Sequence, residues 1–525
     1  TRRSSDLGIA VDNVMAVDEN PVRKVEPEEI TEEDLLAAEE SSCAISGKNS
    51  KSNDDLSVAE VGGKKFFLCS GGHIYDLNEE LIEEEDGQAS GDNIATSEIA
   101  SSAWTTGNKT VLYIIVKFSD QSSDPQSVSN AVSMMNSVDA FIQSNSYGLT
   151  SMTTTVAPVV YTLPGDTAFY VANGDFKLQA DARAVAAANG YNYLDYNLDA
   201  VRWNGGPGSY GGQAYVGWRG CWLKSSSVGV AVHEFGHNYG LWHANFYSTN
   251  DGTAIGSGNN NEYGDSFDTM GSAAAGANHF NAYERKILDW IPAVNTPLIT
   301  TSGNYQLYSF DTASVIDADK NYGLQIKKET TGYNRTYWLD YRQAHTSNSW
   351  LMNGIDLHWG SWGVVDSNTS SSVHSNRGSQ LLDTTPLSPG GKTDSAIVIG
   401  RTFSDVVAGV HITPTGKGGT VPESLYVTVN LGSFTGNAKP TNITTASVTS
   451  AAINEVINFT CTASDPDGDE LAYYWDFGNY SNSINNSNTQ SKSYTVAGIY
   501  SVTCTVSDKK GGVNSQTVVV TVGSP

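Results

Sequence analysis

Cysteine is scarce in this sequence. Only five Cys residues occur among 525 positions. This number is too small for a dense disulfide scaffold, and the spacing fits no Cys-based zinc knot. Because the number is odd, at least one thiol is unpaired or engaged elsewhere. The five residues are Cys43, Cys69, Cys221, Cys461 and Cys504.

Basic residues and long apolar runs are also few. The chain has 30 Lys and Arg against 57 Asp and Glu, a net charge of -27, and more than half of that excess lies in residues 1–100. Such an acidic surface repels phosphate backbones, which argues against a nucleic-acid partner, and bound calcium would offset part of the charge. No apolar run approaches the roughly 20 residues that span a bilayer, so we expect no transmembrane segment. We expect a monomer.

The first part of the chain has the pattern of a propeptide. Residues 1–104 begin with an acidic arm, continue with a hairpin-like pattern at Val58–Leu77, and end with an acidic, Gly- and Ser-containing stretch over 78–104. That last stretch is typical of an exposed, protease-sensitive linker. The chain starts at Thr1 without a signal-peptide pattern, so in an exported protein that segment would precede this numbering.

The remaining sequence predicts three further domains. A continuous apolar run at Val111–Val116, with helical patterns near 126–145 and 175–189, predicts an α/β domain over 105–293. Short alternating segments then predict an all-β sandwich over 294–435. Short strands and turns return over 437–525.

The sequence His233-Glu234-Phe235-Gly236-His237, followed by Gly240 and His243, carries the clearest chemistry. Residues four apart share a helix face, so His233 and His237 can bind one ion with Glu234 beside them. Gly240 permits a turn that brings His243 round as a third ligand. Three imidazoles leave the fourth position of Zn²⁺ open, as in catalytic zinc sites, and Glu234 would act as general base. The alternative is a helix with hydrogen-bonded core histidines, although five fixed positions in this order rarely arise by chance.

This stretch resembles the signature of the metzincin zinc peptidases, and Asp268-Thr269-Met270-Gly271 resembles their Met-turn beneath the metal. The segments Trp242–Asn245, Glu262–Asp265 and Phe280–Tyr283 are similar to the gametolysin-type peptidases. The resemblance covers roughly 105–293 and implies a metzincin-like fold and zinc-dependent endopeptidase activity.

Two site features are less certain from the residues. No Tyr stands two positions after Met270, unlike in the astacin and serralysin branches, and Tyr283 could either reach the metal or pack its own helix. A segment before the zinc motif resembles the metzincin edge strand, which pairs with extended substrate. An ordinary strand covered by a loop is the alternative, and we expect a buried thiol at Cys221. The edge-strand candidates are Ala214, Tyr215, Val216, Gly217 and Trp218.

Cys43 and Cys69 suggest two roles in the propeptide. A thiolate from one of them could occupy the open zinc position and keep a zymogen latent. Cys69 is slightly favoured over Cys43 for this role. A Cys43–Cys69 disulfide is the alternative. The Arg-Cys-Gly context of the matrix metallopeptidases is missing here.

The C-terminal sequence resembles the PKD domain, an Ig-like β-sandwich. The likeness lies in Asp465–Leu471, Tyr474–Gly478 and Tyr500–Asp508. Cys461 and Cys504 would face each other across such a sandwich, which makes a disulfide plausible in an oxidising compartment. The Asp cluster suits either Ca²⁺ or a solvated turn. The resemblance also implies contact with insoluble protein or polysaccharide.

We therefore expect a multi-domain secreted zymogen with a propeptide, an α/β (α+β) metzincin-like catalytic domain, a β-sandwich and a PKD β-sandwich. Its expected substrates are extracellular proteins or peptides, some of them insoluble. A narrow-specificity processing protease is one alternative. An inactive peptidase fold that serves binding or adhesion is another.

Overall fold

The computed structural model describes residues 104–523 except 273, 277, 330–334 and 361–377, and before residue 104 only the backbone of four short strands. The chain forms two compact units. The first runs to Asn245 and resumes over Asn260–Ala293. The second takes Phe246–Asn259, Val294–Gly360 and the chain from Gln380 onward. Phe246–Asn259, which the sequence analysis assigns to 105–293, thus belongs to the second unit.

The hairpin expected near residues 58–77 is present as part of a four-stranded antiparallel sheet. Strands β2 and β3 form the hairpin, and β4 pairs with β3. The strands are β1 (Arg23–Lys24), β2 (Ser57–Val61), β3 (Lys64–Leu68) and β4 (Ile74–Asp76).

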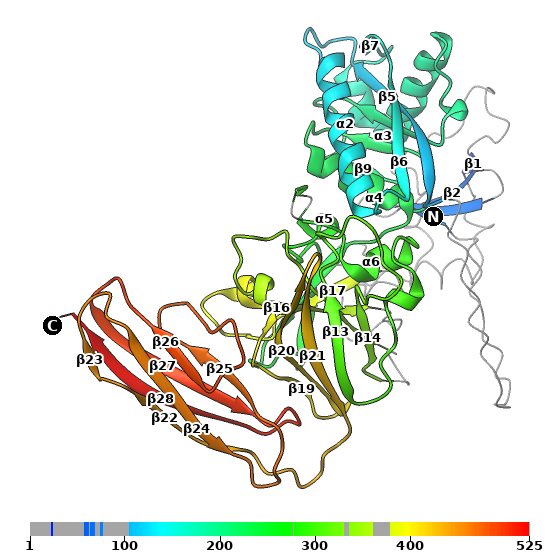
Figure 1. The fold of residues 1–525 in the computed structure, drawn as a ribbon. Coiled ribbons are helices and arrows are strands. Elements are labelled where there is room, and N and C mark those ends of the chain that lie inside the picture. The colour runs from blue at the N-terminus through cyan, green and yellow to red at the C-terminus, as the bar shows by residue number, and fades with distance from the viewer. Residues whose placement is uncertain are drawn as a thin grey trace, which may run out of the picture. The chain divides into compact units, whose positions relative to one another are not determined.

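The central sheet of the first unit has the order β6-β5-β8-β10-β9, with β7 beside β5. Figure 1 shows β5 and β6 side by side in this sheet. The neighbouring strands β6, β5, β8 and β10 are parallel to one another. Strand β9 lies at the edge of the sheet and is antiparallel to β10. The expected α/β class is therefore confirmed. The strands are β5 (Gly107–Lys117), β6 (Thr150–Val156), β7 (Tyr161–Thr162), β8 (Leu198–Arg202), β9 (Gly212–Ala214) and β10 (Cys221–Leu223).

The helices of this unit pack on two hydrophobic cores that share strand β5. Alternate residues Val111, Tyr113 and Ile115 lie in one core with residues of α2 and α4. Leu112, Ile114 and Val116 lie in the other core with residues of α3. Burial on both faces explains the continuous apolar run in the sequence. The helices are α2 (Val128–Asn145), α3 (Thr167–Ala188) and α4 (Val228–Tyr239).

Two of these helices begin at side-chain caps, which supports the helical patterns predicted from the sequence. Ser127 accepts a hydrogen bond from the backbone N–H of Asn130, and Asp166 accepts one from Phe169. Helix α3 starts before the expected 175 and is interrupted at Gly174, whose φ of 77° is non-helical.

Between α4 and β13 the chain forms β11 (Ala244–Thr249), β12 (Gly258–Asn261), α5 (Thr269–Ser272) and α6 (Ala282–Ile287). Strands β11 and β12 belong to a sheet of the sandwich. Short 3-10 turns lie at Tyr193–Asp195, Ala293–Asn295, Leu351–Asn353 and Gly391–Asp394.

The second unit contains the expected sandwich. One sheet has the order β12-β11-β17-β16-β15-β14 with β18 beside β16, and the other has the order β13-β21-β20-β19. Leu339 and Leu357 from the first sheet share a core with Ile412 and Val427 from the second. The strands are β13 (Gly303–Tyr308), β14 (Leu324–Lys327), β15 (Thr336–Asp340), β16 (Gly354–Gly360), β17 (Ser379–Leu382), β18 (Ile397–Val398), β19 (Phe403–Asp405), β20 (Val410–Thr420) and β21 (Glu423–Leu431).

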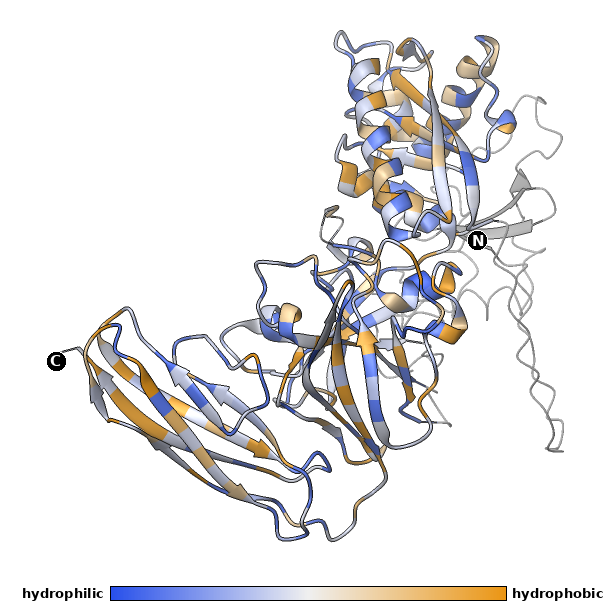
Figure 2. Ribbon diagram, in the orientation of Figure 1, coloured by the Kyte–Doolittle hydropathy of each residue, from blue (hydrophilic) through white to orange (hydrophobic). Residues whose placement is uncertain are grey.

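The C-terminal part of this unit is a second β-sandwich, with sheets β22-β24-β26 and β23-β28-β27-β25. Burial alternates along its strands, and Figure 2 shows the matching alternation of hydrophobic and hydrophilic residues. Trp475 and Phe459 lie in its core. The strands are β22 (Thr441–Ala446), β23 (Ser450–Ala451), β24 (Ile457–Ser464), β25 (Ala472–Asp476), β26 (Thr489–Lys492), β27 (Gly498–Ser507) and β28 (Val513–Val522).

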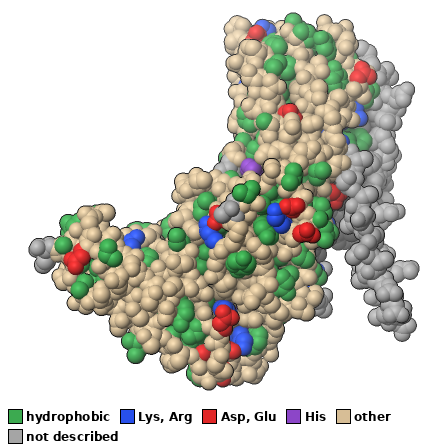
Figure 3. Space-filling view, in the orientation of Figure 1, with side chains coloured by type: hydrophobic (Ala, Val, Ile, Leu, Met, Phe, Trp, Pro, Cys, Tyr) green, Lys and Arg blue, Asp and Glu red, His purple; other side chains and the backbone are tan. Residues whose placement is uncertain are grey.

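Charged side chains are few and scattered on the face shown in Figure 3, as the composition leads one to expect. Within the described part of the chain, no helix combines the length and apolar character needed to cross a membrane.

Candidate metal centre

Helix α4 and the turn after it bring His233, His237 and His243 together. The helix ends at Gly240, which has a φ of 116°, and its N–H bonds to the carbonyl oxygen of His237. The chain then reverses, so that His243 returns to the helix. The three imidazoles are buried, and each offers a ligand nitrogen within 4.8 Å of the others. This buried group could bind a metal ion.

Each imidazole is oriented through its Nδ1 atom. Nδ1 of His233 lies 2.9 Å from the carbonyl oxygen of Thr269, and Nδ1 of His237 lies 2.8 Å from that of Leu241. Nδ1 of His243 lies 2.8 Å from Oε1 of Glu262. An imidazole that donates from Nδ1 presents the lone pair of Nε2, as metal-binding histidines do. The donor set therefore fits a metal such as Zn²⁺.

Burial keeps the first ligand neutral. It lowers the pKa of His233 to about 4, so this imidazole carries no charge at neutral pH and its lone pair stays accessible to an ion.

Glu234 lies next to His233 on α4 and is almost fully buried. Burial raises the pKa of its carboxyl group. Strand β9 runs against this side chain at Gly212, where an added Cβ would collide with Oε1 of Glu234. The edge strand and the predicted general base are therefore neighbours.

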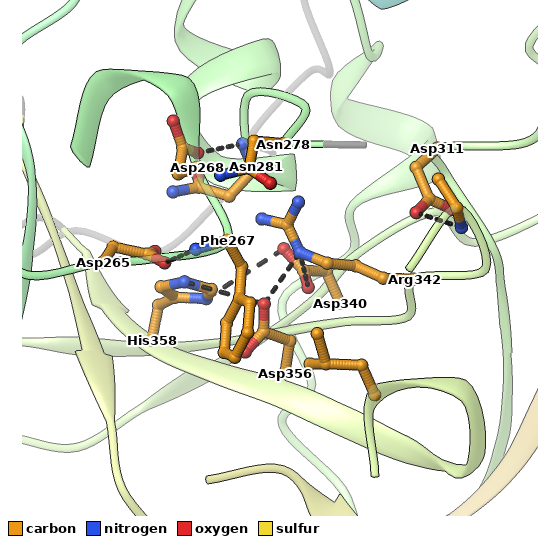
Figure 4. A network of polar contacts seen from close by, with 12 residues as sticks. Asp265, Phe267, Asp268, Asn278, Asn281, Asp311, Asp340, Arg342, Asp356 and His358 are labelled. Carbon is orange, nitrogen blue, oxygen red and sulfur yellow. Dashed lines mark hydrogen bonds and ion pairs between the residues drawn. The ribbon is translucent and has the colours of Figure 1, made fainter. Parts of the chain in front are cut away.

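Met270 packs beneath the same helix. It is fully buried in α5, and an added Cβ on Gly236 would lie 2.5 Å from its Sδ atom. Asp268 fixes this turn, because its carboxylate accepts the N–H of Met270 at 2.7 Å and the N–H of Asn281 at 2.6 Å (Figure 4). Met270 therefore packs against α4 at Gly236, next to His237, and its role as a Met-turn stays a prediction.

The edge strand lies earlier than expected. The predicted segment begins at Ala214, whereas β9 covers Gly212–Ala214, and Val216–Trp218 form a turn. Gly217 has a φ of 68°, and its N–H donates to the carbonyl oxygen of His237. The side-chain amide of Asn238 donates to the carbonyl oxygen of Tyr215. These bonds tie the segment after Ala214 to α4 instead of leaving it extended.

Two residues beside the histidines are absent from the predicted site. Glu262 contacts Nδ1 of His243, and the ring of Tyr263 lies over the His243 ring with centroids 3.8 Å apart. Tyr283, the tyrosine considered from the sequence, is 3% exposed in α6. The Glu262–Asp265 segment has no periodic spacing relative to the zinc motif. In the sequence, the resemblance of this segment to the gametolysin-type peptidases was what pointed to it.

The cysteines have different surroundings. Cys221 is fully buried, and burial raises the pKa of its thiol. Cys461 and Cys504 are buried in the core of the C-terminal sandwich as two neighbouring thiols, so their disulfide stays a prediction. Cys43 and Cys69 lie outside the described residues.

The structure brings together the predicted calcium ligands Asp465, Asp467 and Asp469. Lys510 forms an ion pair with Asp469, and the N–H of Ala438 donates to Asp467. Calcium binding there stays a prediction.

A second buried group on β15 and β16 combines acids with an arginine (Figure 4). Asp340 lies directly opposite Asp356 in the strand register, and His358 follows on the same face. Nε of Arg342 lies 2.7 Å from Oδ2 of Asp356 and 3.9 Å from Oδ1 of Asp340. Since the guanidinium supplies the cation, we interpret this group as a charge network of the sandwich.

Comparisons with known proteins concern the C-terminal part. Residues 437–522 match the family model of the PKD domain, so this sandwich is a PKD domain. The pre-pro-metalloprotease PrtV of Vibrio cholerae is 45% identical over 64 residues, which are 12% of this chain and 7% of that protein. The match thus spans a small fraction of that relative.

Two solved structures are similar to this chain. The PKD1 domain of Vibrio anguillarum Epp is 33% identical and covers 17% of this chain and 99% of its own, with a TM-score of 0.15. The PKD1 domain from the V. cholerae metalloprotease PrtV is 34% identical and covers 16% and 99%, also with a TM-score of 0.15.

Proposed function

We propose that this protein is a secreted zinc-dependent endopeptidase that is made as a zymogen and hydrolyses extracellular proteins or peptides. The observation that carries the proposal is the convergence of three buried histidines whose Nδ1 atoms are all engaged, with Glu234 beside them. The resemblance to metzincin peptidases and the PKD domain also found in a Vibrio metalloprotease support it.

His233, His237 and His243 would hold the ion through Nε2. When bound, Zn²⁺ supplies a Lewis acid that polarises the substrate carbonyl and lowers the pKa of water. Glu234 acts as general base and takes a proton from the attacking water at its carboxylate. It then passes this proton to the amine that leaves.

The edge strand β9 would position the substrate. Strand β9 is the last strand of the sheet and runs antiparallel to β10. A substrate peptide can add to its outer edge as a further strand. Since β9 runs against Glu234 at Gly212, such a peptide would pass close to the general base. Backbone pairing of this kind favours extended segments and places few demands on their sequence.

Metal analysis and peptide hydrolysis test the site together. We expect His233→Ala, His237→Ala and His243→Ala each to lose most of the zinc, whereas Glu234→Ala keeps zinc and loses most turnover. His345→Ala, in the second unit, serves as the control and keeps both. Full zinc occupancy in the three ligand variants, or near-normal turnover of Glu234→Ala, would contradict the assignment.

Latency and substrate contact are further parts of the proposal. We expect the uncut chain to be weakly active until it is cut within about 78–104, with Cys43→Ser or Cys69→Ser raising basal activity if that thiolate blocks the metal. Removal of 437–525 should spare hydrolysis of short peptides and weaken attack on insoluble protein. Equal turnover before and after cutting would contradict latency, and equal loss on both substrates would contradict the accessory role.

A further inference from the structure

Tyr263 covers the candidate metal centre from one side. Its ring centroid lies 3.8 Å from that of His243 and 5.9 Å from that of His233. The side chain is nevertheless 43% exposed, unlike the enclosed Tyr239 and Tyr283, each 3% exposed. Tyr263 therefore contacts the ligands and remains open to a substrate.

The backbone holds Tyr263 in an unusual conformation. Its φ is 58°, a value that residues with large side chains adopt rarely and that is often found at functional sites. Two neighbours fix it there. The N–H of Tyr263 donates to Oδ1 of the buried Asn245 at 3.0 Å, and the N–H of Gly264 donates to the carbonyl oxygen of Asn261 at 3.0 Å. The ring is thus aimed by the segment that also delivers Glu262 to His243.

The charged groups that act on the hydroxyl group of Tyr263 are Glu262 and, more weakly, Glu234. Glu234 also acts on Tyr210, whose hydroxyl donates to the carboxylate of Asp175. Of the two, Tyr263 is the one that borders both the histidines and solvent.

We propose that Tyr263 is a further catalytic residue, whose hydroxyl donates a hydrogen bond to the scissile carbonyl oxygen as negative charge develops on it. This role rests on the proposed peptidase function. A donor aimed at the developing oxyanion stabilises the transition state more than the ground state. Tyr263 lies in the loop before Met270, whereas the tyrosine of the astacin and serralysin branches would follow Met270.

Tyr263→Phe removes the hydroxyl and keeps the ring over His243. We expect unchanged zinc content, a KM within about threefold of the parent, and a kcat reduced about 10²-fold or more, the usual cost of losing one oxyanion donor. Tyr283→Phe is the matched control and should keep both parameters. A kcat of Tyr263→Phe within threefold of the parent would overturn the proposal.

A second readout does not depend on turnover. A peptide phosphinate mimics the tetrahedral transition state, and its affinity can be measured by calorimetry on the zinc-loaded Glu234→Gln protein. We expect the added Tyr263→Phe change to weaken this affinity at least tenfold, while a substrate-like peptide binds equally well. Equal phosphinate affinity would overturn the role of Tyr263. Phosphinate binding that depends on Tyr263 in a parent protein that cleaves no peptide would overturn the proposed function alone.

Tyr263→Asn separates the ring from the hydroxyl. Asn tolerates a positive φ, so the backbone should keep its course while the cover over His243 is lost. We expect this variant to lose zinc affinity as well as turnover, whereas Tyr263→Phe loses turnover alone. Equal loss of zinc in both variants would assign Tyr263 a purely structural role and overturn the proposal.

Discussion

The sulfur of Met270 lies against Gly236, so closely that a Cβ on Gly236 would come within 2.5 Å of it and within 3.3 Å of Phe280. Gly236 stands between Glu234 and His237 on α4. Position 236 holds a glycine because Met270 packs directly against the helix backbone there.

We expect Gly236→Ala to lower the free energy of unfolding by about 1–3 kcal/mol, because the added methyl group overpacks a core without space. The displaced helix should also bind zinc more weakly. Chemical denaturation and metal titration would measure both effects. In the double variant with Met270→Ala, the two changes should be non-additive, since they affect one contact. Additive effects would show that the methyl group does not meet Met270.

Glu262→Gln should weaken zinc affinity by about 10–100-fold while leaving the fold intact, since Glu262 orients His243 and raises its basicity. The side chain of Glu262 is 44% exposed, so its loss leaves no buried cavity. Competition with a fluorescent chelator would measure the affinity. Glu455→Gln, on the PKD domain, is the control. An unchanged affinity would show that the hydrogen bond at 2.8 Å does not tune the ligand.

The sequence allowed the three histidines and Glu234 to be placed, because helical spacing and a short turn act over a few residues, whereas Met270 was assigned only through the resemblance of its segment to a Met-turn. Glu262 and Tyr263 could not be placed in this way. They reach His243 through the pairing of their loop with Asn245, a contact that no local periodicity encodes. The edge strand was misplaced for a similar reason, since Asn238 of α4 binds the segment after Ala214.

Strand patterns had the same limit in the second unit. The sequence predicted the sandwich from alternating segments, but the opposition of Asp340 and Asp356 depends on the register of β15 and β16, which the segments do not specify. The recruitment of Phe246–Asn259 into that unit is likewise a long-range effect.

Asp356→Asn should destabilise the sandwich by about 3–5 kcal/mol, because it leaves the buried guanidinium of Arg342 without its closest carboxylate. Hydrogen exchange of peptides from β15 and β16 would report this loss locally. The control is Asp124→Asn, which removes a pair between Lys117 and a half-exposed carboxylate and should change stability by less than about 1 kcal/mol. Similar effects of both changes would contradict the importance of burial.

The neighbouring thiols of the PKD domain should oxidise with an unusual pH dependence. The thiol of Cys504 and the amide of Asn442 hydrogen-bond to Cys461, and they lower its pKa from 9.0 to about 7. Because the thiolate is the reactive form, disulfide formation with diamide should accelerate as the pH rises towards about 7 and then level off. An ordinary thiol would continue to accelerate until about 9.

The same shift has a consequence for stability. When the pKa of a thiol is lower in the folded state than in the unfolded state, the unfolded chain binds more protons between the two values. The contribution of the Cys461 thiol to the free energy of unfolding is therefore full above about pH 9 and is lost as the pH falls through about 7. Cys504→Ser removes the oxidation partner and should abolish the loss of two hydrogens seen by intact mass after oxidation. Urea unfolding of the reduced domain between these pH values, beside Cys461→Ala, measures the linkage. Disulfide formation that keeps accelerating to pH 9, or a stability that is flat across this window, would show that Cys461 titrates as an ordinary thiol.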